Sequence, residues 1–214
     1  MQKIVIFDMD GTLIDSKKDI TISINYVRQK HYNAPPLSED FIVKAINMEV
    51  RNLPKLFYDT EVYEEKDREL FEAHYEKQCI QNLYLYDGVK EMLETLHQNG
   101  VKLSVATNAP TKFAQEMLAH LQVAALFDVI IGADKVSASK PDPSMLHFIL
   151  NSYNFNPKTD KAWMVGDNSK DMQSAKNANI KALFAAWGFS NDENFPFTLT
   201  KPHEIIKHVF YLKS

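Results

Sequence analysis

Two aspartates separated by one residue follow a short apolar segment near the start of the sequence. Residues 4–13 read Ile-Val-Ile-Phe-Asp-Met-Asp-Gly-Thr-Leu. A short apolar run before a glycine turn is typical of a buried strand, and alternate side chains of a strand share a face. Asp8 and Asp10 therefore point the same way, where their charges repel unless a cation or a shared proton relieves them. The pair predicts metal binding or acid–base chemistry.

Other interpretations of this pair are solvated aspartates in a turn and the start of a calcium loop. A calcium loop is disfavoured because no further Asp or Asn and no closing Glu follow at the required spacing. Gly11 allows a sharp turn directly after the pair without a Cβ clash. With a buried strand before the pair and Thr12 after the glycine, a functional site is favoured.

Three further polar clusters lie at or near the ends of expected strands: Thr107-Asn108, Lys140-Pro141, and Gly166-Asp167 with Asp171 four residues on. In an open α/β sheet, ligands bind outside the carboxyl ends of the strands, so these clusters can converge on the first two aspartates. Four carboxylates at one sheet edge need positive charge, and oxygen-only ligands favour a hard cation such as Mg²⁺.

The remaining polar groups suit a phosphoryl oxygen. Thr107 offers a hydroxyl, Asn108 an amide and Lys140 a positive charge. Each also has a structural interpretation, since Thr107 could cap a helix, Lys140 could be a solvated loop residue and Asp171 could stabilise a helix N-terminus. Their order and their positions at strand ends favour a shared site.

The elements that must position these residues alternate between strands and helices from residue 88 onward. Helical periodicity recurs after Val89, after Phe113 and around Ser169, and Asp142-Pro143 predicts an N-cap followed by the first helical residue. We expect strands at Val101–Ala106, Phe127–Ile131, Ala162–Val165 and Ala182–Ala186. Continuous apolar strands alternating with helices predict an α/β fold with a parallel sheet covered on both faces.

Residues 16–82 interrupt this alternation with helical patterns alone. This stretch is longer than a crossover between strands requires, so we interpret it as a helical cap domain inserted in the core rather than a simple crossover. The expected division is a catalytic core of residues 1–15 and 83–214 and a cap of residues 16–82.

The composition is that of a globular protein of 214 residues with a net charge of −4. This charge argues against nucleic acid as a partner, and no segment is apolar for long enough to cross a membrane. The first residues lack a signal-peptide pattern, and a single cysteine, Cys79, fits a reducing cytoplasm. We expect a cytoplasmic protein, either a monomer or a weak dimer, with Cys79 packed in a helix.

Taken in order, the motifs resemble those of the haloacid dehalogenase-like hydrolases: Asp8-x-Asp10-Gly11-Thr12, Thr107-Asn108, Lys140-Pro141 and Gly166-Asp167-x-x-x-Asp171. The resemblance implies a Rossmann-like core, a helical cap and an aspartyl-phosphate intermediate. It also implies that Asp8 is the nucleophile and Asp10 the general acid/base. Mg²⁺ would be held by Asp8, the Asp10 carbonyl oxygen and Asp167, with Asp171 in support, while Lys140 and Thr107 would bind the phosphoryl group.

Within this superfamily, the segments 10–16 and 139–143 most resemble phosphoglycolate phosphatases. The cap segment 46–57 is similar to their cap loop but has Asn47 where glycine is usual, which leaves the substrate open. Arg51 matches a cap arginine of that loop and is our candidate specificity residue, against the alternative of a solvated surface charge.

We therefore expect a Mg²⁺-dependent phosphatase, a phosphoric monoester hydrolase acting on a small phosphorylated metabolite. A phosphomutase of the β-phosphoglucomutase type or a pyrophosphatase is the alternative. A dehalogenase is disfavoured because it does not need Asp10. A non-catalytic metabolite-binding regulator is also disfavoured, because every catalytic residue type is present.

Overall fold

The computed structural model describes residues 1–48, 51–190 and 195–211. The chain forms two compact units, one of residues 1–14 and 85–214 and the other of residues 15–84. It passes from the first to the second within β2 (Ile14–Asp15) and returns within β3 (Tyr84–Leu85), and these two short strands pair. The boundaries predicted from the sequence were after residue 15 and before residue 83, within two residues of these positions.

The first unit is built on a parallel sheet whose six described strands lie in the order β5 (Val129–Gly132), β4 (Lys102–Thr107), β1 (Lys3–Phe7), β6 (Lys161–Gly166), β7 (Lys181–Ala185) and β8 (Thr198–Leu199). The central strands are buried along nearly their whole length because both faces of the sheet are covered. The predicted α/β fold is confirmed. Only two residues long, β8 is too short to produce a periodic signal in the sequence.

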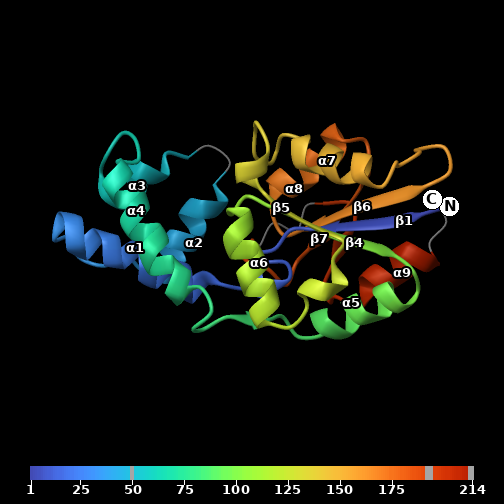
Figure 1. Ribbon diagram of the computed structural model, residues 1–214, viewed down its shortest axis with the longest axis horizontal. Coiled ribbons are helices and arrows are strands. Elements are labelled where there is room, and N and C mark those ends of the chain that lie inside the picture. The colour runs from blue at the N-terminus through green and yellow to red at the C-terminus, as the bar shows by residue number, and fades with distance from the viewer. Residues whose placement is uncertain (49–50, 191–194, 212–214) are drawn as a thin grey trace. The chain divides into compact units, whose positions relative to one another are not determined.

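Helices cover both faces of this sheet (Figure 1). On one face lie α5 (Val89–Gln98), α6 (Thr111–His120) and α9 (Glu204–Phe210), and on the other lie α7 (Ser144–Ser152) and α8 (Ser169–Asn177). Two 3₁₀ turns, η1 (Ala124–Leu126) and η2 (Ala133–Lys135), flank β5. Apolar side chains from α7 and α8 pack against β1, β4 and β6 to form a core that holds the strand ends in place.

Helix α7 begins later than the sequence predicts. Pro143 was expected at the first helical position after an Asp142 N-cap, but the N-cap residue is Pro143 and the helix starts at Ser144. The Asp142 carboxylate accepts a hydrogen bond of 2.9 Å from the Ser144 backbone N–H. The aspartate therefore still caps the chain, but through a turn before the helix, which explains the shift.

The second unit consists of the helices α1 (Lys17–Tyr32), α2 (Glu39–Asn47), α3 (Leu53–Tyr58) and α4 (Glu65–Gln78). It has an apolar core of its own, formed around Ile24, Val27, Ile42 and Phe57. The side chains of Ser38 and Asn52 cap α2 and α3 by accepting backbone N–H groups. Cys79, the single cysteine of the sequence, is buried directly after α4 and is not in a disulfide within the chain.

Two buried carboxylates also join the helices of this unit. Asp19 on α1 accepts hydrogen bonds from Gln78 and from the backbone and side chain of Asn82, at the far end of α4. Asp67 on α4 is bonded to His31 and Tyr32 at the end of α1. A buried carboxylate must be satisfied by such partners, so the contacts fix how α1 and α4 pair. Among the described residues, no helix combines the length and apolar character needed to cross a membrane.

Candidate active site

The strand register brings the predicted polar residues to one edge of the sheet. Phe7, the last residue of β1, pairs with Val105 on β4 and Val165 on β6. Asp8 follows Phe7 directly, and its backbone N–H continues the ladder by bonding to Val165 at 2.8 Å. Thr107 lies two residues after Val105, and Asp167 lies two residues after Val165. Since parallel strands present their carboxyl ends together, the three side chains share this edge.

Lys140 lies at the centre of the group. Its ammonium nitrogen is 2.6 Å from Asp8 Oδ1, 2.7 Å from Asp171 Oδ1 and 2.7 Å from the Ala106 carbonyl oxygen. Burial acts against its charge, but the neighbouring charges of Asp171 and Asp8 outweigh burial and raise the pKa of Lys140. The lysine is therefore fully charged at neutral pH, and three acceptors fix its position.

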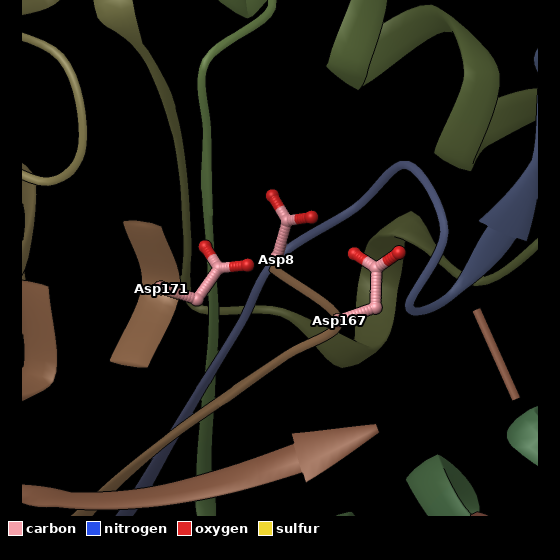
Figure 2. A group of neighbouring side chains, drawn as sticks. All are labelled: Asp8, Asp167 and Asp171. Carbon is pink, nitrogen blue, oxygen red and sulfur yellow. The ribbon is translucent and has the colours of Figure 1, made fainter. Parts of the chain in front are cut away.

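Three buried carboxylates face one another at this edge, as Figure 2 shows for Asp8, Asp167 and Asp171. One ligand oxygen from each lies within 4.8 Å of the others. Burial, followed by the charges of Asp8 and Asp171, raises the pKa of Asp167 well above its usual range. Burial also raises the pKa of Asp171 to about 6, although Lys140 acts in the opposite direction. One ammonium does not neutralise three carboxylates.

A small divalent cation fits this cluster. Its donors are carboxylate oxygens, which hard cations such as Mg²⁺ prefer, and its excess negative charge is what a cation would neutralise. The residues that could hold it are Asp8, Asp167 and Asp171. The Asp10 side chain does not belong to the carboxylate cluster found in the described chain, so the metal contact predicted for Asp10 would use its backbone carbonyl oxygen, as the resemblance implies.

The turn after β1, which contains Asp10 and Gly11, lies against the Asp167 carboxylate at Gly11. Residues 9–14 close on themselves through N–H groups of Thr12, Leu13 and Ile14 that bond to the Met9 carbonyl oxygen. Gly11 has a φ of 84°, and a Cβ atom there would lie 2.3 Å from Asp167 Oδ2. The predicted sharp turn is present, and the glycine is also required because the chain lies against the Asp167 carboxylate.

Asp171 has the helix-capping role that the sequence left open as an alternative, and it also contacts Lys140, which the sequence did not predict. Its Oδ2 accepts the Asn168 backbone N–H at 3.2 Å in a capping box at the start of α8. Its Oδ1 is bound to Lys140. The carboxylate therefore stabilises the helix N-terminus and positions the lysine at the same time.

Thr107 and Asn108 hold different places in this network. The buried Thr107 Oγ1 accepts the Ala109 N–H at 3.1 Å and can still donate its own proton. Asn108 forms two hydrogen bonds with the Lys140 backbone. Its Oδ1 accepts the Lys140 backbone N–H at 2.9 Å, and its Nδ2 donates to the Lys140 carbonyl oxygen at 3.1 Å. Asn108 thus positions Lys140, a contact that the sequence did not predict, while its phosphoryl contact stays a prediction.

Comparison with known proteins agrees with this geometry. Residues 5–185 match the sequence profile of haloacid dehalogenase-like hydrolases. This chain belongs to that family. A phosphoglycolate phosphatase from Aquifex aeolicus is 31% identical over 208 residues, which cover 96% of this chain and 95% of the relative. The prediction of a phosphoric monoester hydrolase is confirmed at the level of reaction class.

Solved structures of the family superpose over nearly the whole chain. A predicted phosphoglycolate phosphatase from Haemophilus somnus 129pt has a TM-score of 0.81 and 27% identity, covering 97% of each chain. A Thermotoga maritima protein provisionally named a β-phosphoglucomutase has a TM-score of 0.73 and 26% identity, covering 97% of this chain and all of its own. Both relatives therefore have the same arrangement of elements as this hydrolase.

The predicted specificity residue Arg51 lies in the helical unit. Its Nη1 donates to the backbone carbonyl oxygens of Ile46 and Met48, at the C-terminal end of α2. Carbonyl groups at a helix end lack partners within the helix, so these bonds stabilise the end of α2. This contact gives Arg51 a structural role that the sequence did not predict, beside its predicted substrate contact.

Replacing Lys140 with methionine is expected to damage both stability and turnover in this hydrolase. The variant keeps the length of the side chain but leaves Asp8 and Asp171 without their shared counter-charge, which typically costs about 3–5 kcal/mol for a buried pair. We expect kcat to fall at least about 100-fold. Urea unfolding and steady-state kinetics measure the two effects.

The matched control is Lys135→Met. Lys135 is exposed and pairs with Asp134 on the surface at 3.5 Å, so its loss is expected to cost no more than about 1 kcal/mol. Similar stability losses for the two variants, or normal turnover in Lys140→Met, would contradict the central position assigned to Lys140.

Proposed function

We propose that this hydrolase is a Mg²⁺-dependent phosphatase that removes the phosphoryl group from a small phosphoglycolate-like metabolite. The observation that carries the proposal is the buried cluster of Asp8, Asp167 and Asp171, of which Asp8 and Asp171 hold the Lys140 ammonium. Such a cluster costs stability unless a cation neutralises it, and phosphoryl transfer uses a bound cation and a fixed lysine in this way. Its relatives named phosphoglycolate phosphatase support the substrate class.

In the proposed reaction, Asp8 is the nucleophile. A carboxylate oxygen of Asp8 attacks phosphorus, the bond between phosphorus and the leaving oxygen breaks, and its electron pair leaves with that oxygen. Asp10 gives this oxygen a proton, and the product alcohol departs. Asp10 then takes a proton from water, which attacks the aspartyl phosphate and releases inorganic phosphate and the free Asp8 carboxylate.

The other site residues bind and orient the phosphoryl group. Lys140 already holds Asp8 Oδ1, and its charge would balance the phosphoryl oxygens as the reaction proceeds. Thr107 would donate its hydroxyl proton to one of these oxygens, and Asn108 would contribute an amide N–H in addition to holding Lys140. Mg²⁺ held by Asp8, Asp167, Asp171 and the Asp10 carbonyl oxygen would supply further charge neutralisation.

A panel of phosphorylated compounds tests this proposal. It should contain 2-phosphoglycolate, a hexose 6-phosphate, pyrophosphate and an aryl phosphate, each assayed for phosphate release with Mg²⁺. We expect the highest kcat/KM for a small anionic monoester such as 2-phosphoglycolate. Preference for pyrophosphate would support the alternative activity, and no release from any of these compounds would contradict a small-metabolite phosphatase.

A phosphomutase is the second candidate function, favoured by the likeness to the Thermotoga maritima protein. In a mutase the aspartyl phosphate must survive long enough to phosphorylate a second sugar hydroxyl rather than react with water. Incubation with a sugar 1-phosphate distinguishes the two activities. A mutase would convert it to another sugar phosphate with little free phosphate, whereas the proposed phosphatase would release phosphate.

We also propose that the helical unit is the cap that sets substrate choice, with Arg51 as its cationic contact for a substrate carboxylate. Arg51→Ala is then expected to raise KM for 2-phosphoglycolate about ten- to a hundredfold, the usual effect of losing one charged hydrogen-bond partner. The KM for an aryl phosphate that carries no charge besides its phosphate group should change much less. Steady-state kinetics on both substrates give the comparison.

Because Arg51 also contacts the end of α2, its replacement could lower the free energy of unfolding as well as change KM. Equal losses on both substrates, accompanied by a lower free energy of unfolding, would show that Arg51 only stabilises the helical unit. Lys55→Ala is a suitable control, since this exposed lysine is paired with Asp59 at 2.8 Å on the surface. An unchanged KM for both substrates would reject the proposed role of Arg51 and would mean that it is a surface charge without a substrate contact.

A further inference from the structure

The segment that follows β7, Trp187–Ser190, contacts the site from a part of the sequence outside the four motifs. We propose that this segment, here called the clamp loop, is a positioning element that fixes Asp167 and the turn after β1 and thereby sets the affinity of the site for its cation. The inference rests on the proposed Mg²⁺ role of Asp167 and adds the groups that hold that carboxylate.

The clamp loop first holds one oxygen of Asp167. The backbone N–H groups of Phe189 and Ser190 both point at Asp167 Oδ2, at 2.7 Å and 3.3 Å. These two bonds fix the orientation of the carboxylate, and they leave Oδ1 as the less constrained oxygen.

The clamp loop also holds the turn that carries Asp10. The indole Nε1 of Trp187 donates to the Thr12 carbonyl oxygen at 2.9 Å, and Thr12 is almost completely buried. The Thr12 hydroxyl lies 3.5 Å from Asp167 Oδ1. One short segment thus contacts both the carboxylate after β6 and the turn after β1, so it fixes the spacing between two parts of the proposed metal site.

Gly188 permits this double contact by its lack of a side chain. A Cβ atom at Gly188 would lie 2.1 Å from the Gly11 carbonyl oxygen and 2.4 Å from Asp167 Cβ. Both distances are far inside van der Waals contact, and the first neighbour is backbone that cannot rotate away. Any larger residue must therefore push the clamp loop off Asp167 or push the turn off its position.

The sequence contained a weak sign of this role. Trp187, Gly188 and Phe189 follow an expected strand, and either the rim of the site or core packing would account for such residues. The backbone contact with Asp167 depends on the path that the loop takes after β7, and the residue types of the loop do not indicate that path. The structure assigns a positioning role to the loop because its N–H groups, not its side chains, contact Asp167.

Two variants test the inference by equilibrium binding of Mg²⁺, measured by isothermal titration calorimetry without substrate. Gly188→Ala is expected to weaken binding about 10- to 100-fold, the usual range when a group that orients a metal ligand is lost. Trp187→Phe keeps an aromatic ring but removes the N–H donor to Thr12, and we expect a loss of about fivefold.

Gly100→Ala is the matched control for a glycine replacement. Gly100 has a φ of 74° with no atom within 4 Å of the position of a Cβ, and it precedes the amino end of β4, away from the strand edge that carries the site. Alanine in this conformation should lower the unfolding temperature in chelator but leave Mg²⁺ affinity unchanged. This separates a general loss of stability from a change in cation binding.

The possible outcomes are distinct. If the wild-type protein binds no Mg²⁺, the proposed metal role fails. If the wild type binds Mg²⁺ and both clamp-loop variants bind it equally well, the clamp-loop inference alone is overturned. If Gly188→Ala does not fold, Trp187→Phe decides, and unchanged affinity in that variant rejects the inference.

Discussion

Asp8→Asn is expected to lower kcat by at least about 10⁴-fold while the protein still folds. An amide cannot replace the ionised carboxylate as nucleophile, and removal of a nucleophile typically costs this much or more. The fold should persist because asparagine has the same shape and the substitution removes one charge from a crowded cluster. Steady-state kinetics and a cooperative thermal unfolding transition measure the two effects.

Asp128→Asn provides the control for this substitution. Asp128 is a partly exposed residue that pairs with Lys102 at 3.5 Å, and its replacement should leave kcat unchanged. Near wild-type turnover of natural substrates by Asp8→Asn would reject the nucleophile assignment. A variant that fails to unfold cooperatively would show instead that Asp8 is needed for the fold.

Removal of divalent cations is expected to abolish turnover and to lower the unfolding temperature. Without a cation, Asp8, Asp167 and Asp171 repel one another in a buried site. Adding Mg²⁺ at about 100 times its dissociation constant should restore turnover and stabilise the fold by about 2.7 kcal/mol. Ca²⁺ should bind without supporting turnover, because it takes more ligands at longer distances.

Asp167→Asn separates the metal effect from general damage. In chelator this variant should melt at or above the temperature of the wild type, because one of the repelling charges is gone. It should lose most of the stabilisation that Mg²⁺ gives the wild type. Full turnover of the wild type in excess chelator would contradict the metal role of the cluster.

The parts of the site that sequence could predict are those that follow from strand ends. Apolar runs fix where β1, β4 and β6 end, and parallel strands present those ends together, so Asp8, Thr107 and Asp167 could be predicted to meet. The turn at Gly11 was predictable for a similar reason, since a glycine directly after a strand indicates a sharp change of direction.

The contacts that sequence missed depend on backbone groups and on the path of loops. The bonds from Asn108 to the Lys140 backbone and from Phe189 to Asp167 use N–H and carbonyl groups that every residue carries. No residue type indicates such a contact. The two-residue strands β2 and β3 could not be predicted from the sequence either, because a periodic pattern needs more residues than they contain.

Chemical identification of the phosphorylated residue tests nucleophilic catalysis by Asp8 directly. Wild-type protein with Mg²⁺ and its best substrate should be quenched during turnover and treated with borohydride, which reduces an aspartyl phosphate to homoserine. Peptide mass spectrometry then locates the change. We expect homoserine at position 8 and none in the Asp8→Asn variant. Homoserine at another aspartate, or none at position 8 from enzyme trapped while its intermediate accumulates, would contradict nucleophilic catalysis by Asp8.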